Sequence, residues 1–452
     1  MNKNKKLILI LIILFSVFIS SIYFFLSLDS NKKLSYLISE EHKELIKKYI
    51  FPYRLISHQE QIIAELTPLS FEMKFKESLE DIVVLNNLTL SNGLFLERFK
   101  LAKGFYSGIS NINPGSGYID FYENNIVILS SRGILAYSNN LTGKIIFKQI
   151  KNNINYFINS SQFKRNKKFS LKDILISKNK IYISFTEEIK NNCFNTSIIS
   201  ADMNYENIVF KKLFSPKECV SSVNNDGINR EFAPTQSGGR MVKFDKNHIL
   251  LSTGEFRNRN LAQDKESVNG KILKININDS NYEVISMGHR NPQGLYFDEE
   301  NNFILETEHG PLGGDEINLI EIDKISKDKI QNFGWAISSA GEHYGLKSEA
   351  NKTKYEKYPL YKSHSEHGFI EPLISFVPSI AISEIVKIQS NKYVVSSMKD
   401  KSIYFFELNQ QKQIINLNRV EVHERIRDLK FHDNKLYLFM EDTASIGLIN
   451  LK

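Results

Sequence analysis

The sequence predicts an all-β fold, a six-bladed β-propeller, from one unit that recurs six times. Each copy is an apolar strand, a tight polar turn and a second apolar strand, with Ile, Val, Tyr and Phe flanking an Asn, Asp or Lys turn, as in β-hairpins. The copies cover residues 117–130, 171–184, 240–252, 294–307, 384–397 and 427–440. A single hairpin cannot bury its sheet faces alone. We therefore expect six blades stacked around an axis, with loops converging on a central pocket.

The N-terminal stretch from Leu7 to Leu28 is uncharged and mostly apolar, and it is close to the length of a bilayer-spanning helix. Lysines lie in residues 1–6, so the positive-inside rule predicts a cytoplasmic tail there and places the rest on the periplasmic, extracytoplasmic side. A signal peptide, cleaved to leave a secreted protein, is the alternative. Because the stretch ends in bulky residues at 22–26 rather than small ones, we expect a retained transmembrane signal anchor.

Residues 29–100 separate the predicted anchor from the first repeat. Ser39 precedes an amphipathic pattern that includes Leu45, Ile46 and Ile50, and a second helix is expected over residues 55–66. No catalytic motif lies in this segment. We expect a helical stalk or cap over 29–100, followed by the propeller over 101–452.

Composition excludes one class of partner and leaves the cysteines open. The net charge is +7 and the basic residues are scattered, without the interleaved aromatic residues of a nucleic-acid groove, so we expect no nucleic-acid partner. Cys193 and Cys219 are the two cysteines of the chain. In an oxidising compartment they can form one disulfide, and two buried thiols are the alternative. Their spacing does not indicate a metal site.

Polar residues concentrate in two loops beside neighbouring predicted strands. Residues 288–293 read GHRNPQ and residues 308–311 read EHGP. A Gly-Pro pair exposes consecutive carbonyl groups that suit a hard cation. Gly, Pro and Asn also occur in ordinary turns. Two adjacent loops, both rich in Arg, His and Glu, favour a functional site.

A series of segments resembles the glucose/sorbosone dehydrogenase family, which includes soluble quinoprotein glucose dehydrogenase and the periplasmic aldose sugar dehydrogenases. The segments occur in family order over roughly residues 230–452. They are QSGGRMVKF (236–244), LSTGE (251–255), NGKILKI (269–275), GHRNPQGL (288–295), EHGPLGGDEINLI (308–320), NFGW (332–335), VPSIA (377–381) and RIRDLKF (425–431). The resemblance implies a six-bladed propeller that uses pyrroloquinoline quinone (PQQ) and calcium, in agreement with the six repeats.

The resemblance implies the residues that hold PQQ, a tricarboxylate with an ortho-quinone. Arg290 and Asn291 match residues at the quinone edge, and Lys399 matches a lysine that reaches the quinone. Arg425 and Arg427 match paired arginines near the cofactor's face and carboxylates, a role that suits guanidinium groups. Without the resemblance, Lys399 would be interpreted as a solvated turn lysine, and Arg425 and Arg427 as a salt-bridged pair on one strand face.

The resemblance also implies metal positions. The carbonyl groups of Gly310 and Pro311 match those that hold the catalytic calcium, which acts as a Lewis acid on the quinone oxygens. Glu316 and the carbonyl of Phe333 match a second, structural calcium position, although Glu316 could simply accept hydrogen bonds from backbone amides. His309 has no role in this scheme, and we expect it to be packed or hydrogen-bonded.

One position departs from the family pattern, in which a histidine acts as general base beside an acidic residue. Thr235 stands at the histidine position, or Gln236 if the gap is moved by one, and neither accepts a proton near pH 7. Glu255 matches the acidic partner. Losing a general base typically lowers the rate by roughly 10²–10⁴-fold.

Three outcomes of this departure are open. Glu255 could act as the base, directly or through a water held by Thr235, if burial raises its pKa. His289 or His309 could replace the missing histidine, or the chain could bind cofactor or sugar without efficient oxidation.

The expected function is PQQ- and calcium-dependent oxidation of an aldose sugar or similar alcohol, with weakened catalysis and an unidentified membrane or periplasmic electron acceptor. A non-catalytic propeller that binds a carbohydrate or a protein is the first alternative. A calcium-dependent, lactonase-like hydrolase is the second, but acidic and amide side chains would then ring the metal. Here backbone carbonyl groups and arginines are found instead.

Overall fold

The computed structural model describes residues 15–18, 20, 84–101, 116–131, 133–138, 147–158, 170–223, 232–326, 330–344 and 352–451. The chain divides into two compact units, Met1–Ala64 and Glu65–Lys452. Only residues 15–18 and 20 of the first unit are described, and they are helical. The predicted tail, most of the predicted anchor and both predicted stalk helices lie outside the described residues. No helix within the described ranges is long and apolar enough to cross a membrane.

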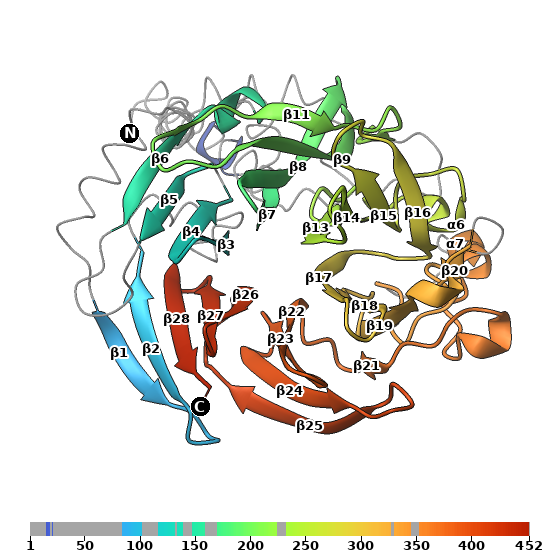
Figure 1. Cartoon of the computed structure of the whole chain (residues 1–452). Helices are drawn as coiled ribbons and strands as arrows, with labels where there is room; N and C mark the ends of the chain where they lie inside the picture. Colours follow the sequence, from blue (N-terminus) through green and yellow to red (C-terminus); the bar gives the residue numbers. More distant parts are fainter. Residues whose placement is uncertain are drawn as a thin grey trace, which may run out of the picture. The chain divides into compact units, whose positions relative to one another are not determined.

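Six sheets of four or five strands surround a central axis in the second unit, as Figure 1 shows, and each blade is named by its innermost strand. From the inside outward, the β3 blade contains β3 (Gly117–Tyr122), β4 (Asn125–Ser130), β5 (Leu135–Ser138), β6 (Lys148–Asn152) and β10 (Asn207–Ile208). The β7 blade contains β7 (Leu171–Ser177), β8 (Lys180–Lys190), β9 (Cys193–Asp202) and β11 (Lys211–Phe214), and β12 (Val220–Ser221) also pairs with β9. The β13 blade contains β13 (Gly238–Lys243), β14 (His248–Thr253), β15 (Lys271–Asn276), β16 (Tyr282–Met287) and β20 (Gln331–Asn332). The β17 blade contains β17 (Pro292–Asp298), β18 (Phe303–Glu308), β19 (Asp315–Glu321) and β21 (Ile374–Phe376). The β22 blade contains β22 (Ile382–Gln389), β23 (Lys392–Ser397), β24 (Ser402–Leu408) and β25 (Ile414–Glu421). The β26 blade contains β26 (Ile426–His432), β27 (Lys435–Met440), β28 (Ser445–Asn450), β2 (Phe95–Lys100) and β1 (Val84–Thr89). Two short helices, α6 (Asn260–Gln263) and α7 (Lys352–Lys357), lie in loops.

The six predicted hairpins are confirmed, and each one forms the two innermost strands of a blade. The first repeat is the β3–β4 pair, in which Tyr122 opposes Asn125 across the turn. The last repeat is the β26–β27 pair, in which His432 opposes Lys435. The second strand of each of these two hairpins, β4 and β27, is buried from its second residue onward, which explains its almost continuous apolar run.

The predicted boundary between stalk and propeller at residue 101 is wrong. Residues 84–100 are not helical but form β1 and β2, and β2 pairs with β28 so that Leu96 opposes Ile449. The N-terminal strands thereby complete the blade begun by the C-terminal residues, and this closes the ring and leaves no unpaired edge on β28. Burial of Leu96 and Phe99 in two apolar clusters accounts for the pairing.

Apolar side chains fill the space between neighbouring blades. Ile119 and Ile128 of the β3 blade pack with Phe439 and Ile446 of the β26 blade in one such cluster. At the axis, side chains of the inner strands also bond to the backbone of the next blade. These bonds are Asp428 to Ile119 N (2.7 Å), Asp120 to Ile176 N (2.6 Å), Asp173 to Met241 N (2.7 Å), Arg240 Nε to Gln293 O (2.6 Å), Glu384 to Leu295 N (3.1 Å) and Ser383 Oγ to Ile426 O (2.7 Å). They fix the blades in place around the site.

Cys193 and Cys219 form a disulfide, as one of the two interpretations of the sequence predicted. The bond ties the start of β9 to the segment that leads into β12, which itself pairs with β9 through Val220 and Phe194. Residues 219–221, which follow β11, are therefore held against their own blade.

Candidate functional site

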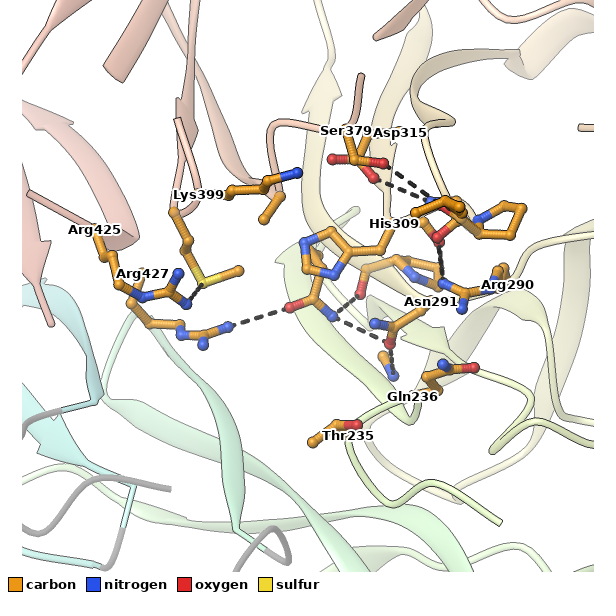
Figure 2. Close-up of a pocket in the computed structure, with 18 of the residues that line it drawn as sticks. Thr235, Gln236, Arg290, Asn291, His309, Asp315, Ser379, Lys399, Arg425 and Arg427 are labelled. Atoms are coloured by element: carbon orange, nitrogen blue, oxygen red, sulfur yellow. Dashed lines mark hydrogen bonds between the residues drawn. The ribbon is translucent and has the colours of Figure 1, made fainter. Parts of the chain in front are cut away.

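A cavity of about 780 Å³ lies where the inner strands and their loops converge, and all six blades contribute to its wall. Six basic side chains and two acidic side chains, Asp315 and Glu441, line it. The basic residues are Lys172, Arg240, Arg290, Lys399, Arg425 and Arg427. Figure 2 shows four of them, all predicted from the sequence, around one hollow. This excess of positive charge suits an anionic ligand.

Arg290 is held rigidly in the short connection between β16 and β17. Its Nη1 donates hydrogen bonds to the carbonyl oxygens of His309 (2.8 Å) and Gly310 (2.6 Å), and its guanidinium lies 5.3 Å from the ring centroid of Trp335. Its backbone N–H donates to Glu308 Oε2 at 2.5 Å. The buried guanidinium is therefore fixed on several sides before any ligand arrives, which is the preorganisation that electrostatic catalysis requires.

Asn291 and Gln293 connect Arg290's loop to the β26 blade. Asn291 Oδ1 accepts from Gly238 N (3.3 Å) and from Gln293 Nε2 (3.2 Å). Gln293 Oε1 in turn accepts from Arg427 Nη1 at 3.3 Å (Figure 2). Gln293 was not predicted as a site residue, although it lies inside the GHRNPQGL segment that indicated the site.

Arg425 and Arg427 face the cavity together, as their alternation predicted, and both also pair with one buried carboxylate. Arg425 Nε lies 3.0 Å from Glu441 Oε2, and Arg427 Nε lies 2.6 Å from Glu441 Oε1. Burial alone would raise the pKa of Glu441, but Arg427 and Arg425 lower it. Two guanidinium groups thus share one carboxylate and leave a net positive charge on the cavity wall. Glu441 was not identified from the sequence.

Lys399 lies two residues after the end of β23, and its exposed side chain also lines the cavity (Figure 2). Lys172 of β7 lies in the wall and is buried. Desolvation, followed by repulsion from Arg427, lowers the pKa of Lys172 to about 7. Near neutral pH, Lys172 therefore carries less positive charge than an ordinary lysine.

The structure distinguishes between the two residues that could stand at the missing histidine position. Gln236 is buried, and its amide NH₂ donates to Glu255 Oε1 at 2.8 Å while its amide oxygen accepts from Arg290 Nη2 (2.9 Å) and Arg257 Nε (3.1 Å). This amide orientation satisfies every partner. Thr235 is exposed at the cavity wall. Gln236 is thus the cavity residue that contacts the acidic group.

Glu255 lies behind Gln236 and is fully buried. Burial raises its pKa to about 7, against the opposing effects of Arg290, Arg259 and Arg257. Its Oε2 has no hydrogen-bond partner among the described residues. Because Gln236 lines the cavity in front of it, the geometry gives Glu255 no direct path to a substrate in the hollow.

His309 lines the cavity, whereas His289 is fully buried and does not. His309 Nε2 lies 2.7 Å from the carbonyl oxygen of Ile382, which can only accept, so Nε2 must donate. Burial lowers the pKa of His309, with further lowering by Arg427 and Arg290 and an opposing effect of Asp315. The ring is then neutral and its Nδ1 carries a lone pair. Of the two histidines that the sequence offered as replacements for the missing base, only His309 therefore lines the cavity.

The carbonyl groups of Gly310 and Pro311 lie at the cavity wall beside His309. Gly310 O accepts from Arg290 Nη1 (2.6 Å), and Pro311 O accepts from Ser379 Oγ (3.4 Å). Each carbonyl oxygen has a second lone pair, so both can still coordinate a cation.

Glu316 and Phe333, predicted as a second calcium position, lie away from the cavity wall. Both are buried, and Glu316 opposes Glu308 across the β18–β19 pair. His364 Nε2 lies 3.7 Å from Glu316 Oε1, and the ring of Phe333 stacks on His289 with centroids 5.0 Å apart.

Comparison with known proteins agrees with this architecture. A sequence model of the Glucose / Sorbosone dehydrogenase family matches residues 167–449. The chain is 28% identical over 231 residues to the aldose sugar dehydrogenase YliI of Escherichia coli K12, a match that covers 46% of this chain and 57% of the relative. It is 39% identical over 85 residues to the quinoprotein glucose dehydrogenase B of Acinetobacter calcoaceticus, which covers 16% of each chain. With the first of these relatives, the match thus spans about half of the relative's length.

Solved structures share the fold. A crystal structure of glucose dehydrogenase superposes with a TM-score of 0.56 and 20% identity over 74% of this chain and 96% of that chain. The PQQ-bound aldose sugar dehydrogenase of Streptomyces coelicolor superposes with a TM-score of 0.50 and 16% identity over 82% of this chain and 98% of that chain. Both likenesses concern the propeller.

Proposed function

Because this chain belongs to the glucose/sorbosone dehydrogenase family, we propose that it oxidises an aldose sugar or similar alcohol, with hydride transfer to PQQ in the axial cavity and with calcium beside it. The observation that carries the proposal is the cavity wall, where Arg425, Arg427 and Lys399 outnumber Glu441. Arg240 does not add to this excess, because three buried carboxylates already balance it. The positive charge on this wall would attract and hold a multiply negative redox cofactor.

The residues present fit PQQ in charge and size. The cavity volume of about 780 Å³ falls within the range of roughly 300–1,000 Å³ typical of cofactor sites. Arg425 and Arg427 would hold the carboxylates, and Lys399 would reach the quinone. The carbonyl groups of Gly310 and Pro311 would hold calcium, a cation that prefers oxygen ligands. When bound, PQQ supplies the carbon that accepts the hydride.

The chain's own residues would orient the substrate and move its proton. Arg290, fixed by the carbonyl groups of His309 and Gly310, would stabilise negative charge that develops near it. His309 Nδ1 would accept the proton of the substrate hydroxyl, since Nε2 is committed to the Ile382 carbonyl. Gln236 cannot serve as a base, and the lowered pKa of His309 makes it a weaker base than an ordinary histidine. Both features support weakened catalysis.

A non-catalytic propeller that binds a carbohydrate or a protein is the second candidate, and one observation favours it. Gln236, a residue that cannot accept a proton, lies beside Glu255, where the acidic partner would orient a general base. A hydrolase is less supported, because Asp315 and Glu441 already have partners. Asp315 accepts from the backbone of Gly310 and Ile382, and Glu441 pairs with two arginines.

Reconstitution of the purified full chain with PQQ and calcium tests the proposal. Stoichiometric uptake, followed by bleaching of the quinone absorbance on addition of aldoses, is expected. Uptake without bleaching by any sugar would favour the binding propeller, and no uptake at all would refute the proposed cofactor.

We also propose that the segment Leu7 to Leu28 anchors the protein, with the propeller on the extracytoplasmic side and close to a membrane electron acceptor. Cell fractionation should recover the protein with membranes after a high-salt wash. Recovery in the soluble fraction without the N-terminal segment would instead indicate cleavage and secretion.

A further inference from the structure

Two clusters of metal-ligating side chains lie inside the propeller, and none of their residues lines the cavity. Each is buried and has ligand atoms within 4.8 Å of one another. The first cluster, Asp173, Glu384 and Asp428, already contains a cation. Arg240 Nη1 lies 3.1 Å from Asp173, 3.1 Å from Glu384 and 2.7 Å from Asp428. A guanidinium group therefore balances these carboxylates.

The second cluster, His289, Glu306 and Glu308, lacks such a cation. His289 Nδ1 lies 3.7 Å from Glu306 Oε2 and 3.6 Å from Glu308 Oε1, and all three side chains are buried. Asn318 Nδ2 donates to both carboxylates, at 3.0 and 3.1 Å. Within the described part of the chain, no lysine or arginine forms an ion pair with Glu306 or Glu308. Buried carboxylates without a counter-charge are costly, by several kcal/mol each in order of magnitude.

Two atoms of this second cluster have no hydrogen-bond partner among the described residues. They are His289 Nδ1 and Glu306 Oε1, on side chains that are both 0% exposed. The imidazole is nevertheless held firmly, because its Nε2 lies 2.8 Å from Ser286 Oγ and its ring stacks on Phe333. Anchoring of one ring nitrogen while the other faces carboxylates is the usual arrangement of a metal-binding histidine.

We propose that His289, Glu306 and Glu308 bind a divalent transition metal ion with the preferences of Zn²⁺. One imidazole nitrogen and two carboxylates suit zinc, whereas calcium takes oxygen ligands. In tetrahedral zinc sites, bonds of about 2.0–2.1 Å place neighbouring ligand atoms about 3.3 Å apart. The separations of 3.6 and 3.7 Å need only a small contraction to reach that value.

The metal would stabilise the loop that presents Arg290 to the cavity. His289 directly precedes Arg290 in the chain, and Glu308 Oε2 accepts the Arg290 backbone N–H at 2.5 Å. Two of the three ligands thus hold the Arg290 loop. The metal site does not depend on the proposed function, because zinc can be measured without PQQ or sugar.

Metal analysis of the full chain tests this proposal. Protein purified from zinc-supplemented cells should contain one zinc per chain by inductively coupled plasma mass spectrometry, and excess calcium should not displace it. After chelation, titration with Zn²⁺ alone should restore one site. Glu306→Gln should weaken this site at least 100-fold. Glu384→Gln, a change in the cluster that Arg240 balances, should leave zinc stoichiometry unchanged.

Cobalt substitution provides a second measurement if Glu306→Gln does not fold. Co²⁺ added to the chelated wild-type protein should give the intense visible absorption of a tetrahedral site, and Zn²⁺ should abolish it. Wild-type protein with neither stoichiometric zinc nor a cobalt spectrum would refute the proposal. So would a folded Glu306→Gln variant that binds zinc as tightly as the wild type.

Discussion

Replacing Gln236 with histidine should restore a general base beside Glu255. The Gln236 amide lies 2.8 Å from Glu255 Oε1 and 2.9 Å from Arg290 Nη2, so a histidine ring in this place would have a carboxylate to orient it and would face the cavity. This is the arrangement in which a carboxylate fixes the tautomer of a catalytic histidine.

The expected gain follows from the contribution of general-base catalysis, roughly 10²–10⁴-fold in rate. The lower end applies here for two reasons. In the proposed function His309 already accepts the proton, as a weak base. The neighbouring guanidinium groups of Arg290 and Arg257 also disfavour the imidazolium that forms when histidine takes the proton. We therefore expect Gln236→His to raise kcat about 100-fold.

The assay is dye reduction by the PQQ- and calcium-loaded full chain with an aldose, measured across pH. Thr235→His is the matched control, because Thr235 is exposed at the same wall and is not the residue that contacts Glu255. A large gain from Thr235→His with none from Gln236→His would refute the assignment. No gain from either variant, despite cofactor uptake, would mean that the missing base does not limit the rate.

Three further predictions concern the cofactor wall, the buried carboxyl group and ring closure. Arg427→Gln should weaken PQQ binding roughly 10–100-fold in an equilibrium titration, which is the effect of losing one charge-assisted hydrogen bond. Arg419→Gln on β25 is the control and should not weaken binding, because Arg419 pairs with Asp400 outside the cavity. Equal PQQ affinity of the two variants would contradict the assigned site. Burial raises the pKa of Glu255 to about 7 in the folded protein, whereas its ordinary value is 4.5. Its contribution to the free energy of unfolding is therefore complete below pH 4.5 and is lost as the pH rises to 7, because the carboxyl group ionises first in the unfolded chain. Glu255→Gln should therefore flatten the pH dependence of urea unfolding over this window and stabilise the protein by up to about 3 kcal/mol at pH 8, and an unchanged pH slope would show that Glu255 ionises normally. Leu96→Ala on β2 should destabilise the propeller by about 2–5 kcal/mol in the same assay, because Leu96 is fully buried. Phe95 on the same strand is 50% exposed, so Phe95→Ala should destabilise the protein much less. Similar losses of stability in the two variants would argue against closure of the ring through β2.

The candidate site shows where sequence reasoning succeeds. Arg290, Asn291, Lys399, Arg425 and Arg427 were predicted to surround one ligand, and all five line the same cavity. The family resemblance implied these positions, since without it Lys399 would be interpreted as a solvated turn lysine and Arg425 and Arg427 as a salt-bridged pair. The motif alone could not show that Glu441 pairs with both arginines, because Glu441 follows the next strand, β27, and lies outside the motif.

The sequence by itself determined the six hairpins, the family and the cationic character of the axis, because strand periodicity and turn chemistry are local properties that short segments carry. Only the tertiary structure showed that residues 84–100 pair with β28, that Gln236 rather than Thr235 contacts Glu255, that His309 faces the cavity and that His289 meets two unbalanced carboxylates. Each of these depends on contacts between segments far apart in the chain or on the direction of a single side chain. Such contacts are set by closure of the ring and by packing between strands and loops, and no local pattern encodes them.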